Sequence, residues 1–412
     1  MTLPAFTEPP VGSLFDEEEI EAVRGVLASG ESLNRGKDVD AFEKEFAEYC
    51  GAAHAVAVSS CTAALRLAIQ VLRLGRGDEV VVQANVFWAS MAPLMERGAA
   101  IKIVDVDGYS LTADPASVEK QITPQTKAIL VLSMGGNPCR MDELRRIADA
   151  HGIPIVEDAA HAVGTSYRGK KIGAWADITC FSFSTLKNMG TLGEGGMFVT
   201  NNKEWAAEVA KLREYWPIGR SHAVQREGFG PYRKPVDSSF MRPGDSYAVD
   251  WDELQEMGTN YKMSSPAAAV GRVQLKKLDK HNAIRRSIAT RYDTALRGLQ
   301  GVALLKQYPT AQPSWHLYNF FLLQESGIDR DAFVAHMNDA HNIQLINRFW
   351  PIHLHSVLRM QGHAISEAPV YERIWFRELV ALPIAPSMDD GIVERVISAV
   401  ESTYRSLSGK AS

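Results

Sequence analysis

Two side chains near the middle of the sequence, Asp158 and Lys187, could carry out covalent chemistry together. Asp158 ends the apolar run IPIVED, and Lys187 lies between the apolar run ITCFSFS and the glycine-rich turn GEGG. A partly desolvated lysine amine can attack an aldehyde, and a carboxylate at a strand end can pair with a protonated pyridine nitrogen. Taken singly, a helix N-cap for Asp158 and a surface position for Lys187 are the commoner roles. Their combination with the GEGG turn favours the chemical interpretation.

Hydroxyl groups lie in two places that could bind a phosphate. Ser182 and Ser184 lie just before the lysine, where they suit an anionic ligand group. Ser60, Cys61 and Thr62 fall between the strand-like run AHAVAVSS and the helix-like run TAALRLAIQVLRL. Backbone amides and hydroxyls at a helix N-terminus form an anion site, although an ordinary Ser/Thr cap has the same sequence.

The run NVFWAS offers an aromatic side chain to the same region. Phe87 and Trp88 follow the strand-like run EVVVQ and begin the helix-like run WASMAPLMERGA. Either ring could lie flat on a planar ligand, and packing in the core is an equally common role for such a ring.

The first half of the chain predicts an α/β fold with a mostly parallel sheet. Near-continuous β-branched runs alternate with amphipathic helical runs, which is typical of strands covered on both faces. The expected strands are AHAVAVSS, EVVVQAN, IKIVDVD, KAILVLS, IPIVEDA, ITCFSFS and GGMFVTN. Ligands bind at the carboxyl ends of such strands, and the residues named above fall at those ends.

The pattern breaks between Tyr215 and Gly258. This stretch is rich in Gly, Pro, Arg and aromatic residues and shows no clear period, so it is either a functional loop or an exposed connection. We expect Tyr215 and Arg220 within it to contact a substrate, because aromatic rings offer flat apolar faces and arginines suit phosphates or carboxylates. A long helical region then begins near Ser265, and a helix DDGIVERVISAVESTYRSL closes the chain.

Size and composition narrow the class of protein. A chain of 412 residues exceeds one typical core and favours two domains. A net charge of −5 gives no reason to expect nucleic acid or an anionic membrane as a partner. No apolar run is long enough to span a bilayer, and the first residues do not resemble a signal peptide. Four scattered cysteines predict neither a metal site nor disulfides and fit a cytoplasmic location.

The order of these motifs resembles that of the DegT/StrS-type sugar aminotransferases, a family of fold-type I enzymes that depend on pyridoxal 5'-phosphate (PLP). The likeness covers nearly the whole chain, and EDAAH followed by SFSTLKN and GEGG is its most specific part. Further segments that carry it are FEKEFAEYCGAAHAVAVSSCTAALRLAI, GGNPCRMDELRRIADAHG, GTNYKMSSPAAAVGRVQLKKLD, WPIHLH and LPIAPSMDD.

The resemblance implies a role for each motif residue. Lys187 would form the Schiff base with PLP, and Asp158 would pair with the pyridine nitrogen. The other implied cofactor contacts are His161 near the ring hydroxyl, Phe87 stacked on the ring with Trp88 beside it, and Ser60, Cys61, Thr62 and Ser182 around the phosphate. Asn260 would reach the phosphate in a neighbouring subunit, which implies a homodimer with shared active sites. His353 lies in a segment that resembles one near the substrate pocket.

The family also implies a fold and a reaction. We expect an N-terminal arm at 1–29, a large PLP-binding domain at 30–265 with an insertion at 215–258, and a connecting helix with a small C-terminal α+β domain at 266–412. The reaction would move an amino group from glutamate or glutamine to a keto sugar or keto cyclitol in a biosynthetic pathway. Another PLP reaction, such as dehydration, elimination or cyclisation, and a regulatory protein that only retains the fold are the alternatives.

Two positions depart from the family's pattern. Cys61 stands where the family has the glycine of S-G-T, and Lys262 stands where it has the arginine of N-Y-R-M. Glycine permits backbone angles that cysteine resists, so we expect a slightly reshaped phosphate site. The long 215–258 segment adds to these departures and leaves the acceptor open.

Overall fold

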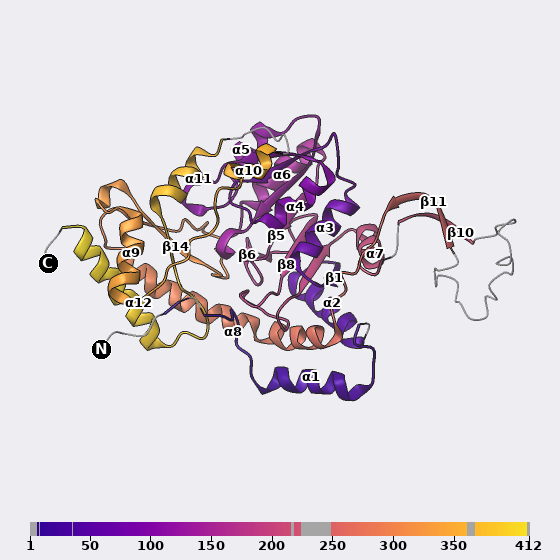
Figure 1. Cartoon of the computed structure of the whole chain (residues 1–412), viewed down its shortest axis with the longest axis horizontal. Helices are drawn as coiled ribbons and strands as arrows, with labels where there is room; N and C mark the ends of the chain where they lie inside the picture. Colours follow the sequence, from indigo (N-terminus) through magenta and orange to yellow (C-terminus); the bar gives the residue numbers. More distant parts are fainter. Residues whose placement is uncertain are drawn as a thin grey trace.

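A seven-stranded sheet lies at the centre of the computed structural model, which describes residues 6–7, 9–34, 36–215, 218–223, 249–360 and 367–409 (Figure 1). The strand order is β1-β9-β8-β5-β4-β2-β3. Strand β9 is antiparallel to both neighbours, and the remaining pairs are parallel. The expected α/β fold with a mostly parallel seven-stranded sheet is therefore confirmed. The strands are β1 (His54–Val58), β2 (Glu79–Gln83), β3 (Ala100–Val104), β4 (Thr126–Leu132), β5 (Ile155–Asp158), β8 (Ile178–Ser182) and β9 (Gly196–Thr200).

Helices cover both faces of this sheet, which explains why its strands are apolar throughout. Successive residues of a strand face opposite sides, and neighbours such as Ile155 and Val156 belong to separate buried clusters. The helices of the large domain are α2 (Lys37–Cys50), α3 (Cys61–Val71), α4 (Trp88–Arg97), α5 (Pro115–Gln121), α6 (Met141–His151) and α7 (Lys203–Leu212). Side chains of α3 and α7 lie in one cluster, and side chains of α2 and α6 lie in the other.

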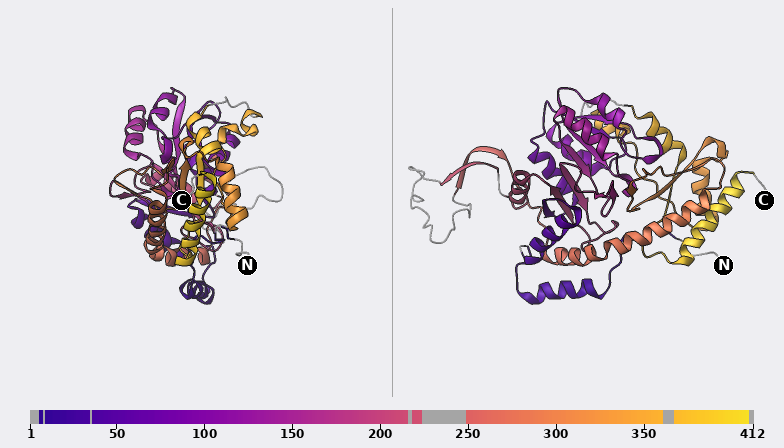
Figure 2. Two further views of the ribbon diagram at one scale, coloured as in Figure 1. Left: turned by 90° about the vertical axis from the view of Figure 1, so that its left-hand side faces the viewer. Right: turned by 180° about the vertical axis from the view of Figure 1, so that it is seen from behind.

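A long helix, α8 (Ser265–Leu296), connects the large domain with the C-terminal part (Figure 1). The N-terminal helix α1 (Glu17–Ser29) lies along α8 in both side views of the ribbon (Figures 1 and 2). Lys277 of α8 donates to Asp16 and Glu19, the two residues that form the capping box of α1. The N-terminal segment is thus held to the helix that links the two parts of the chain.

The C-terminal part is an α+β unit, as the sequence predicted. Its three-stranded sheet has the order β12-β14-β15, and α9 and α12 pack against each other beside it (Figure 1). The elements are β12 (Val302–Leu304), β14 (Tyr318–Leu322), α9 (Arg330–His341), α10 (Ser356–Met360), α11 (Pro369–Arg373), β15 (Leu379–Leu382) and α12 (Asp390–Leu407). A further small sheet, β13 (Ala311–Gln312), β6 (Ser166–Tyr167) and β7 (Lys170–Lys171), joins this part to the large domain.

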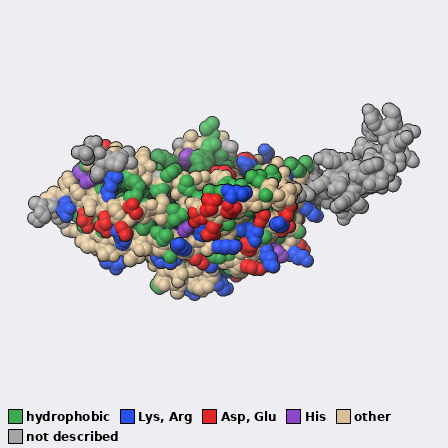
Figure 3. All heavy atoms as spheres, turned by 90° about the horizontal axis from the view of Figure 1, so that it is seen from below, with side chains coloured by type: hydrophobic (Ala, Val, Ile, Leu, Met, Phe, Trp, Pro, Cys, Tyr) green, Lys and Arg blue, Asp and Glu red, His purple; other side chains and the backbone are tan. Residues whose placement is uncertain are grey.

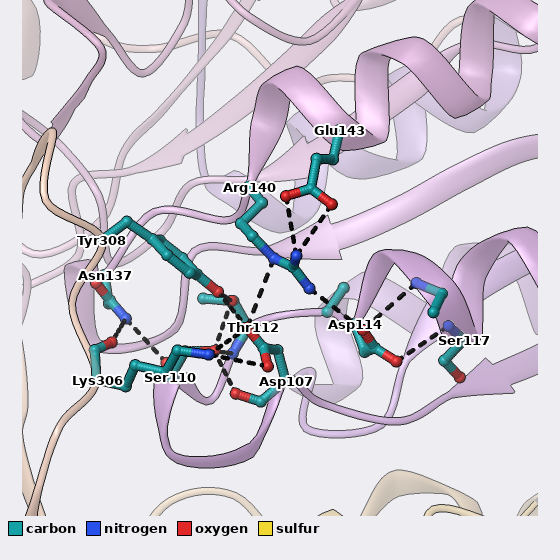
Figure 4. Close-up of polar contacts among 12 residues, drawn as sticks. Asp107, Ser110, Thr112, Asp114, Ser117, Asn137, Arg140, Glu143, Lys306 and Tyr308 are labelled. Carbon is teal, nitrogen blue, oxygen red and sulfur yellow. Dashed lines mark hydrogen bonds and ion pairs between the residues drawn. The ribbon is translucent and has the colours of Figure 1, made fainter.

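A network of polar side chains fastens the two parts together at a second place (Figure 4). Tyr308 donates its hydroxyl to Asp107 at 2.8 Å, and Lys306 reaches the same carboxylate at 3.1 Å. Asn137, which follows β4, donates its amide to the backbone oxygen of Lys306 at 3.0 Å. Arg140 forms ion pairs with Asp107, with Asp114 at the N-cap of α5 and with Glu143 of α6. Residues far apart in the sequence are therefore fixed behind the end of β4.

The segment that showed no period contains two strands, so the expectation of a stretch without regular structure was wrong at both ends. Strands β10 (Ile218–Ala223) and β11 (Val249–Glu256) form an antiparallel pair with two irregularities in register. This pair, which we call the arm, projects from the body of the molecule beyond α7 (Figures 1 and 2). The base of the arm is held by Arg97 of α4, whose guanidinium donates to the Glu256 carboxylate at 2.6 Å. Register irregularities hide a strand's alternation from the sequence.

Charged side chains lie on the surface of the described part of the chain. Acidic and basic side chains are interspersed on the face drawn in Figure 3. Within the described ranges, no helix combines the length and the apolar character needed to cross a bilayer.

Candidate active site

A cavity of about 360 Å³ opens at the carboxyl ends of three neighbouring strands. Leu132 ends β4, Asp158 ends β5 and Ser182 ends β8, and all three side chains line it. This is the position where parallel sheets bind ligands. Nine residues singled out from the sequence lie in its wall: Ser60, Cys61, Thr62, Phe87, Asp158, His161, Ser182, Ser184 and Lys187.

Asp158 forms the floor of the cavity and is 3% exposed. Ser90 donates its hydroxyl to Oδ2 at 2.5 Å, and the backbone N–H of Ala160 donates to Oδ1 at 3.0 Å. Burial raises the pKa of Asp158, while these donors and the nearby charge of Lys187 act in the opposite direction. The residues after Asp158 form turns, so its interpretation as a helix N-cap was wrong.

The lysine lies in a loop whose shape is fixed by backbone hydrogen bonds. Lys187 N donates to Ser184 O at 2.9 Å, and Thr185 N donates to Gly193 O at 2.9 Å. Phe183 N donates to Gly195 O at 2.8 Å, which closes the loop at its base. The Lys187 side chain is half-buried and lines the cavity, so it is not the exposed loop residue of the alternative interpretation.

The N-terminal segment packs directly on this loop, a contact that the sequence did not reveal. Gly12 N donates to Thr185 O at 2.8 Å, and Arg285 of α8 donates to Gly12 O at 2.6 Å. A Cβ atom on Gly12 would lie 2.1 Å from the backbone oxygen of Leu186. Only glycine therefore lets the chain approach the lysine loop so closely.

The start of α3 supplies the polar end of the cavity. Ser60 caps this helix by accepting from Ala63 N at 3.1 Å, so its capping role and its place in the cavity wall coexist. Gly196 of β9 lies beneath it, and a Cβ there would meet the Ser60 carbonyl carbon at 2.4 Å. Thr62 and Ser182 add hydroxyl groups. Helix N-terminal amides with hydroxyls attract an anion such as phosphate.

Cys61, at the glycine position of the family motif, is buried between the helix and Asp158. Its Sγ lies 3.4 Å from Cys180 O and 3.8 Å from Asp158 Oδ1. Burial raises the pKa of the Cys61 thiol well above its usual value, so it stays protonated and behaves as a small uncharged side chain.

Aromatic rings form the opposite wall and the opening of the cavity. Phe87 is 50% exposed, so its interpretation as a core residue was wrong. The centre of its ring lies 5.2 Å from the centre of the Phe349 ring. Trp88 points elsewhere and packs on His355 at 4.3 Å. The rings of His161 and His316 lie 4.4 Å apart. Burial lowers the pKa of His161 well below its usual value, so that imidazole is neutral.

The C-terminal half contributes residues that the sequence analysis missed. His316, Arg348 and Phe349 line the cavity together with Glu194 of the GEGG turn. His316 lies shortly before β14, and Phe349 lies in an irregular stretch after α9. Neither belongs to a motif used above, so no local signal marked them. Only the packing of the C-terminal unit on the large domain brings them to the strand ends.

Besides Trp88, four expected site residues lie outside the wall that the described residues form. His353 is buried and its Nε2 lies 2.8 Å from Glu372 Oε1. Tyr215 is exposed beneath the Lys262 amine, 4.0 Å from its ring centre. Asn260 is exposed, and its backbone forms an isolated antiparallel β-bridge with that of Glu214. The side chain of Arg220 falls outside the described residues.

Across the described parts of the chain, no three His, Cys, Asp or Glu side chains come together as ligands for a metal ion. The polar groups of the cavity are two carboxylates, one amine, one guanidinium, several hydroxyls and two neutral imidazoles.

The fold and this constellation define an aminotransferase, with a lysine and a buried carboxylate at the ends of parallel strands. Comparison with known proteins agrees with that class. The chain belongs to the DegT/DnrJ/EryC1/StrS aminotransferase family, whose model matches residues 14–401. The resemblance inferred from EDAAH, SFSTLKN and GEGG is thereby confirmed.

Characterised relatives resemble the chain over almost their full length. The dTDP-3-amino-3,4,6-trideoxy-alpha-D-glucose transaminase of Streptomyces venezuelae is 36% identical over 92% of this chain and 90% of its own. The spore coat polysaccharide biosynthesis protein SpsC of Bacillus subtilis is 35% identical over 95% and 96%. The crystal structure of S. venezuelae DesV in complex with a ketimine intermediate superposes with a TM-score of 0.79 at 34% identity, over 96% and 95% of the two chains.

Proposed function

We propose that this protein uses PLP to transfer an amino group from glutamate or glutamine to a keto sugar or keto cyclitol in a biosynthetic pathway. The observation that carries the proposal is that Lys187 and the buried Asp158 line one cavity, with the start of α3 at its polar end. This is the set of groups that an aldehyde, a ring nitrogen and a phosphate require of a protein.

The cavity fits PLP group by group. Asp158 is a buried carboxylate with both oxygens hydrogen-bonded, which suits it to a protonated ring nitrogen. The hydroxyls of Thr62 and Ser182, with the N-terminal amides of α3, suit the phosphate. The half-exposed Phe87 ring offers a face for stacking on a flat heterocycle. When bound, PLP supplies an electron sink that stabilises negative charge at the carbon beside the amine.

The chain's own residues do the remaining work. The Lys187 amine would hold the cofactor at its aldehyde group and would carry the proton that moves between substrate and cofactor. Asp158 keeps the ring nitrogen protonated because its negative charge is held by Ser90 and Ala160 in a buried site. His161 accepts from Gly135 N through Nδ1 at 3.3 Å, which leaves Nε2–H to donate to a ring hydroxyl.

The relatives support a sugar as the acceptor. The transaminase of S. venezuelae is named for a dTDP-linked amino sugar, and SpsC is named for polysaccharide biosynthesis. The cavity is open at Phe87 and Phe349, where an acceptor larger than an amino acid could enter. Arg348 in the wall offers a cation for an anionic group of donor or acceptor.

We further propose a homodimer in which each arm serves the other subunit's site. The described part of the arm lines no part of its own chain's cavity, and it projects from the body (Figure 1). Asn260, at the base of the arm, is exposed and also lies outside that cavity. Both features fit residues that act on a second copy, with Tyr215 and Arg220 near that copy's substrate.

Mixed dimers test the sharing of sites. Subunits carrying Lys187→Ala and subunits carrying Asn260→Ala are each expected to be impaired, and their mixture should recover part of the activity. Recovery follows because one of the two shared sites in a mixed dimer keeps both residues intact. No recovery in a mixed dimer verified by native mass spectrometry would contradict sharing.

Isotope transfer tests the reaction itself. The PLP-loaded enzyme is incubated with amino-15N glutamate and a panel of keto sugars and keto cyclitols, and the products are analysed by mass spectrometry. We expect 15N in a new amine of the acceptor, with glutamine labelled at the α-amine as the second donor. A product that has lost water or ammonia without gaining 15N would replace transamination by the alternative PLP chemistry.

A further inference from the structure

His316 connects the cavity with the residue next to the lysine. Its Nδ1 lies 3.2 Å from Asn188 Oδ1, and its ring lines the cavity. Asn188 is 2% exposed, and its Nδ2 donates to Ser314 O at 2.8 Å and to Asn282 Oδ1 at 2.9 Å. Three segments distant in sequence, the lysine loop, α8 and the stretch before β14, thus meet behind Lys187.

The hydrogen-bond directions in this network follow from its backbone partners. Ser314 O is a carbonyl and can only accept, so the Asn188 atom facing it must be the amide nitrogen. Asn282 obeys the same logic, because its own Nδ2 donates to Val163 O at 3.0 Å. The Asn188 atom that faces His316 is therefore the oxygen. An amide oxygen cannot donate, so Nδ1 of His316 must carry a proton.

His316 holds no second proton. Burial lowers its pKa well below the usual value, and the neighbouring His161, Lys187, Arg285 and Arg348 lower it further. A neutral imidazole with Nδ1–H has a lone pair on Nε2. His161 has the opposite tautomer, because its Nδ1 accepts from a backbone N–H. The two facing rings therefore differ in which nitrogen is protonated.

We propose that His316 is a positioning residue for Lys187: its Nδ1–H holds the Asn188 side chain, and Asn188 holds the backbone of the lysine. The tautomer is a property of the chain alone, whereas the effect on Lys187 chemistry rests on the function proposed above. Asn188 follows Lys187 directly, so a rotation of its side chain would move the lysine's backbone and the direction of its amine. The network replaces that freedom with three hydrogen bonds from fixed elements.

The tautomer can be measured without cofactor. The chain has 11 histidines, and 15N-histidine labelling of the PLP-free protein should give for His316 a protonated Nδ1 and an unprotonated Nε2. The resonance is assigned by its loss in His316→Asn. A protonated Nε2 with a bare Nδ1 would overturn the inference and leave the proposed function intact.

Three substitutions separate the two ring nitrogens. The amide of His316→Asn reaches the Nδ1 position and can still donate to Asn188, whereas His316→Gln reaches the Nε2 position and His316→Phe reaches neither. We expect His316→Asn to keep near-normal rates, and His316→Gln and His316→Phe to lower kcat roughly five- to tenfold, the equivalent of about one hydrogen bond. Borohydride reduction in the presence of PLP should label Lys187 to an extent that falls in the same variants in which kcat falls.

A double substitution tests whether the two residues act as one unit. His316→Phe combined with Asn188→Ala should lower kcat no further than Asn188→Ala alone, because both changes break one chain of contacts. Thermal unfolding midpoints identify any variant that has lost its fold. If His316→Phe fails to fold, the comparison of His316→Asn with His316→Gln still tests the proposal. Rescue by glutamine instead of asparagine, or additive losses in the double variant, would overturn the proposal.

Discussion

The floor and the opening of the cavity are built in opposite ways. The floor consists of Asp158, Ser182 and the lysine loop, which come from one stretch of about forty residues and are tied by hydrogen bonds to the sheet. The opening consists of Phe87 and residues such as Phe349, which come from distant segments and meet through ring contacts. A rigid floor fixes shared chemistry, and an adaptable opening lets one scaffold accept different substrates.

This difference has an energetic basis. Hydrogen bonds in a buried site are strong and leave costly unpaired groups when broken. Contacts between half-exposed rings are weaker and tolerate replacement by other apolar groups. Changes at the floor should therefore affect every substrate alike, and changes at the opening should discriminate among acceptors.

The largest expected effect comes from removing the amine at the floor. Lys187→Ala should lower turnover at least about 10²-fold, since a positioned proton-transfer group contributes that much or more. PLP should then bind only noncovalently, and borohydride should no longer tag the protein. Lys120→Ala, at an exposed lysine of α5 that does not line the cavity, serves as the control and should leave both measurements unchanged. Reduction at another lysine in the native enzyme would contradict the assignment.

Removing the arm should lower acceptor turnover and leave the chemistry at the floor of the cavity unchanged. Replacing residues 219–255 by a short Gly-Ser linker keeps Glu256, which Arg97 holds. We expect acceptor turnover to fall about 10²-fold, because a misplaced substrate loses that much rate. The spectrum of the lysine-bound cofactor, the dimer and the reaction with glutamate should persist. Full acceptor rate and unchanged selectivity in the shortened protein would show that the arm is no specificity element.

A smaller effect is expected from removing the Ser90 hydroxyl, which donates to the Asp158 carboxylate. Ser90→Ala removes the hydrogen bond to Asp158 Oδ2, which stabilises the ionised form, so the pKa of Asp158 should rise. The acid limb of the pH–rate profile should move to higher pH, and kcat should fall about tenfold, in line with a hydrogen bond to a charged group.

Ser133→Ala is the matched control for this change. Ser133 donates at 2.6 Å to Glu157, the adjacent buried carboxylate of β5, whose side chain points to the opposite face of the sheet. Burial raises the pKa of Glu157 to about 7. The control should leave the acid limb in place. If the acid limb moves equally in both variants, it reports the stability of the sheet and not the protonation of Asp158.

The parts of the site that could be predicted are those with local sequence signals. The strands of the central sheet are continuous apolar runs, and polar residues at the ends of such runs, such as Asp158 and Ser182, lie where parallel sheets bind ligands. Lys187 became recognisable through its glycine-rich neighbour. The confirmed fold and family follow from these runs and motifs.

The rest depends on tertiary packing that no local pattern encodes. Ser90 lies within a helix and looks like any small helical residue, yet it holds the floor carboxylate. His316 reaches Asn188 because the stretch before β14 packs against α8, where Arg285 donates to Trp315 O at 3.2 Å. The arm escaped notice because its two strands pair with irregular register and are separated by a long connection. Long-range contacts of this kind are set by the assembled core.

The contact of Gly12 with the lysine loop has a consequence for the order in which the site forms. Gly12 leaves the ribosome early, but its partners Thr185 and Arg285 are made long afterwards. The first segment of the chain must therefore wait, undocked, until most of the protein has been synthesised. Completion of the catalytic loop is thus tied to completion of α8, so nascent chains that stop short of Arg285 lack the contact that holds Gly12 in place.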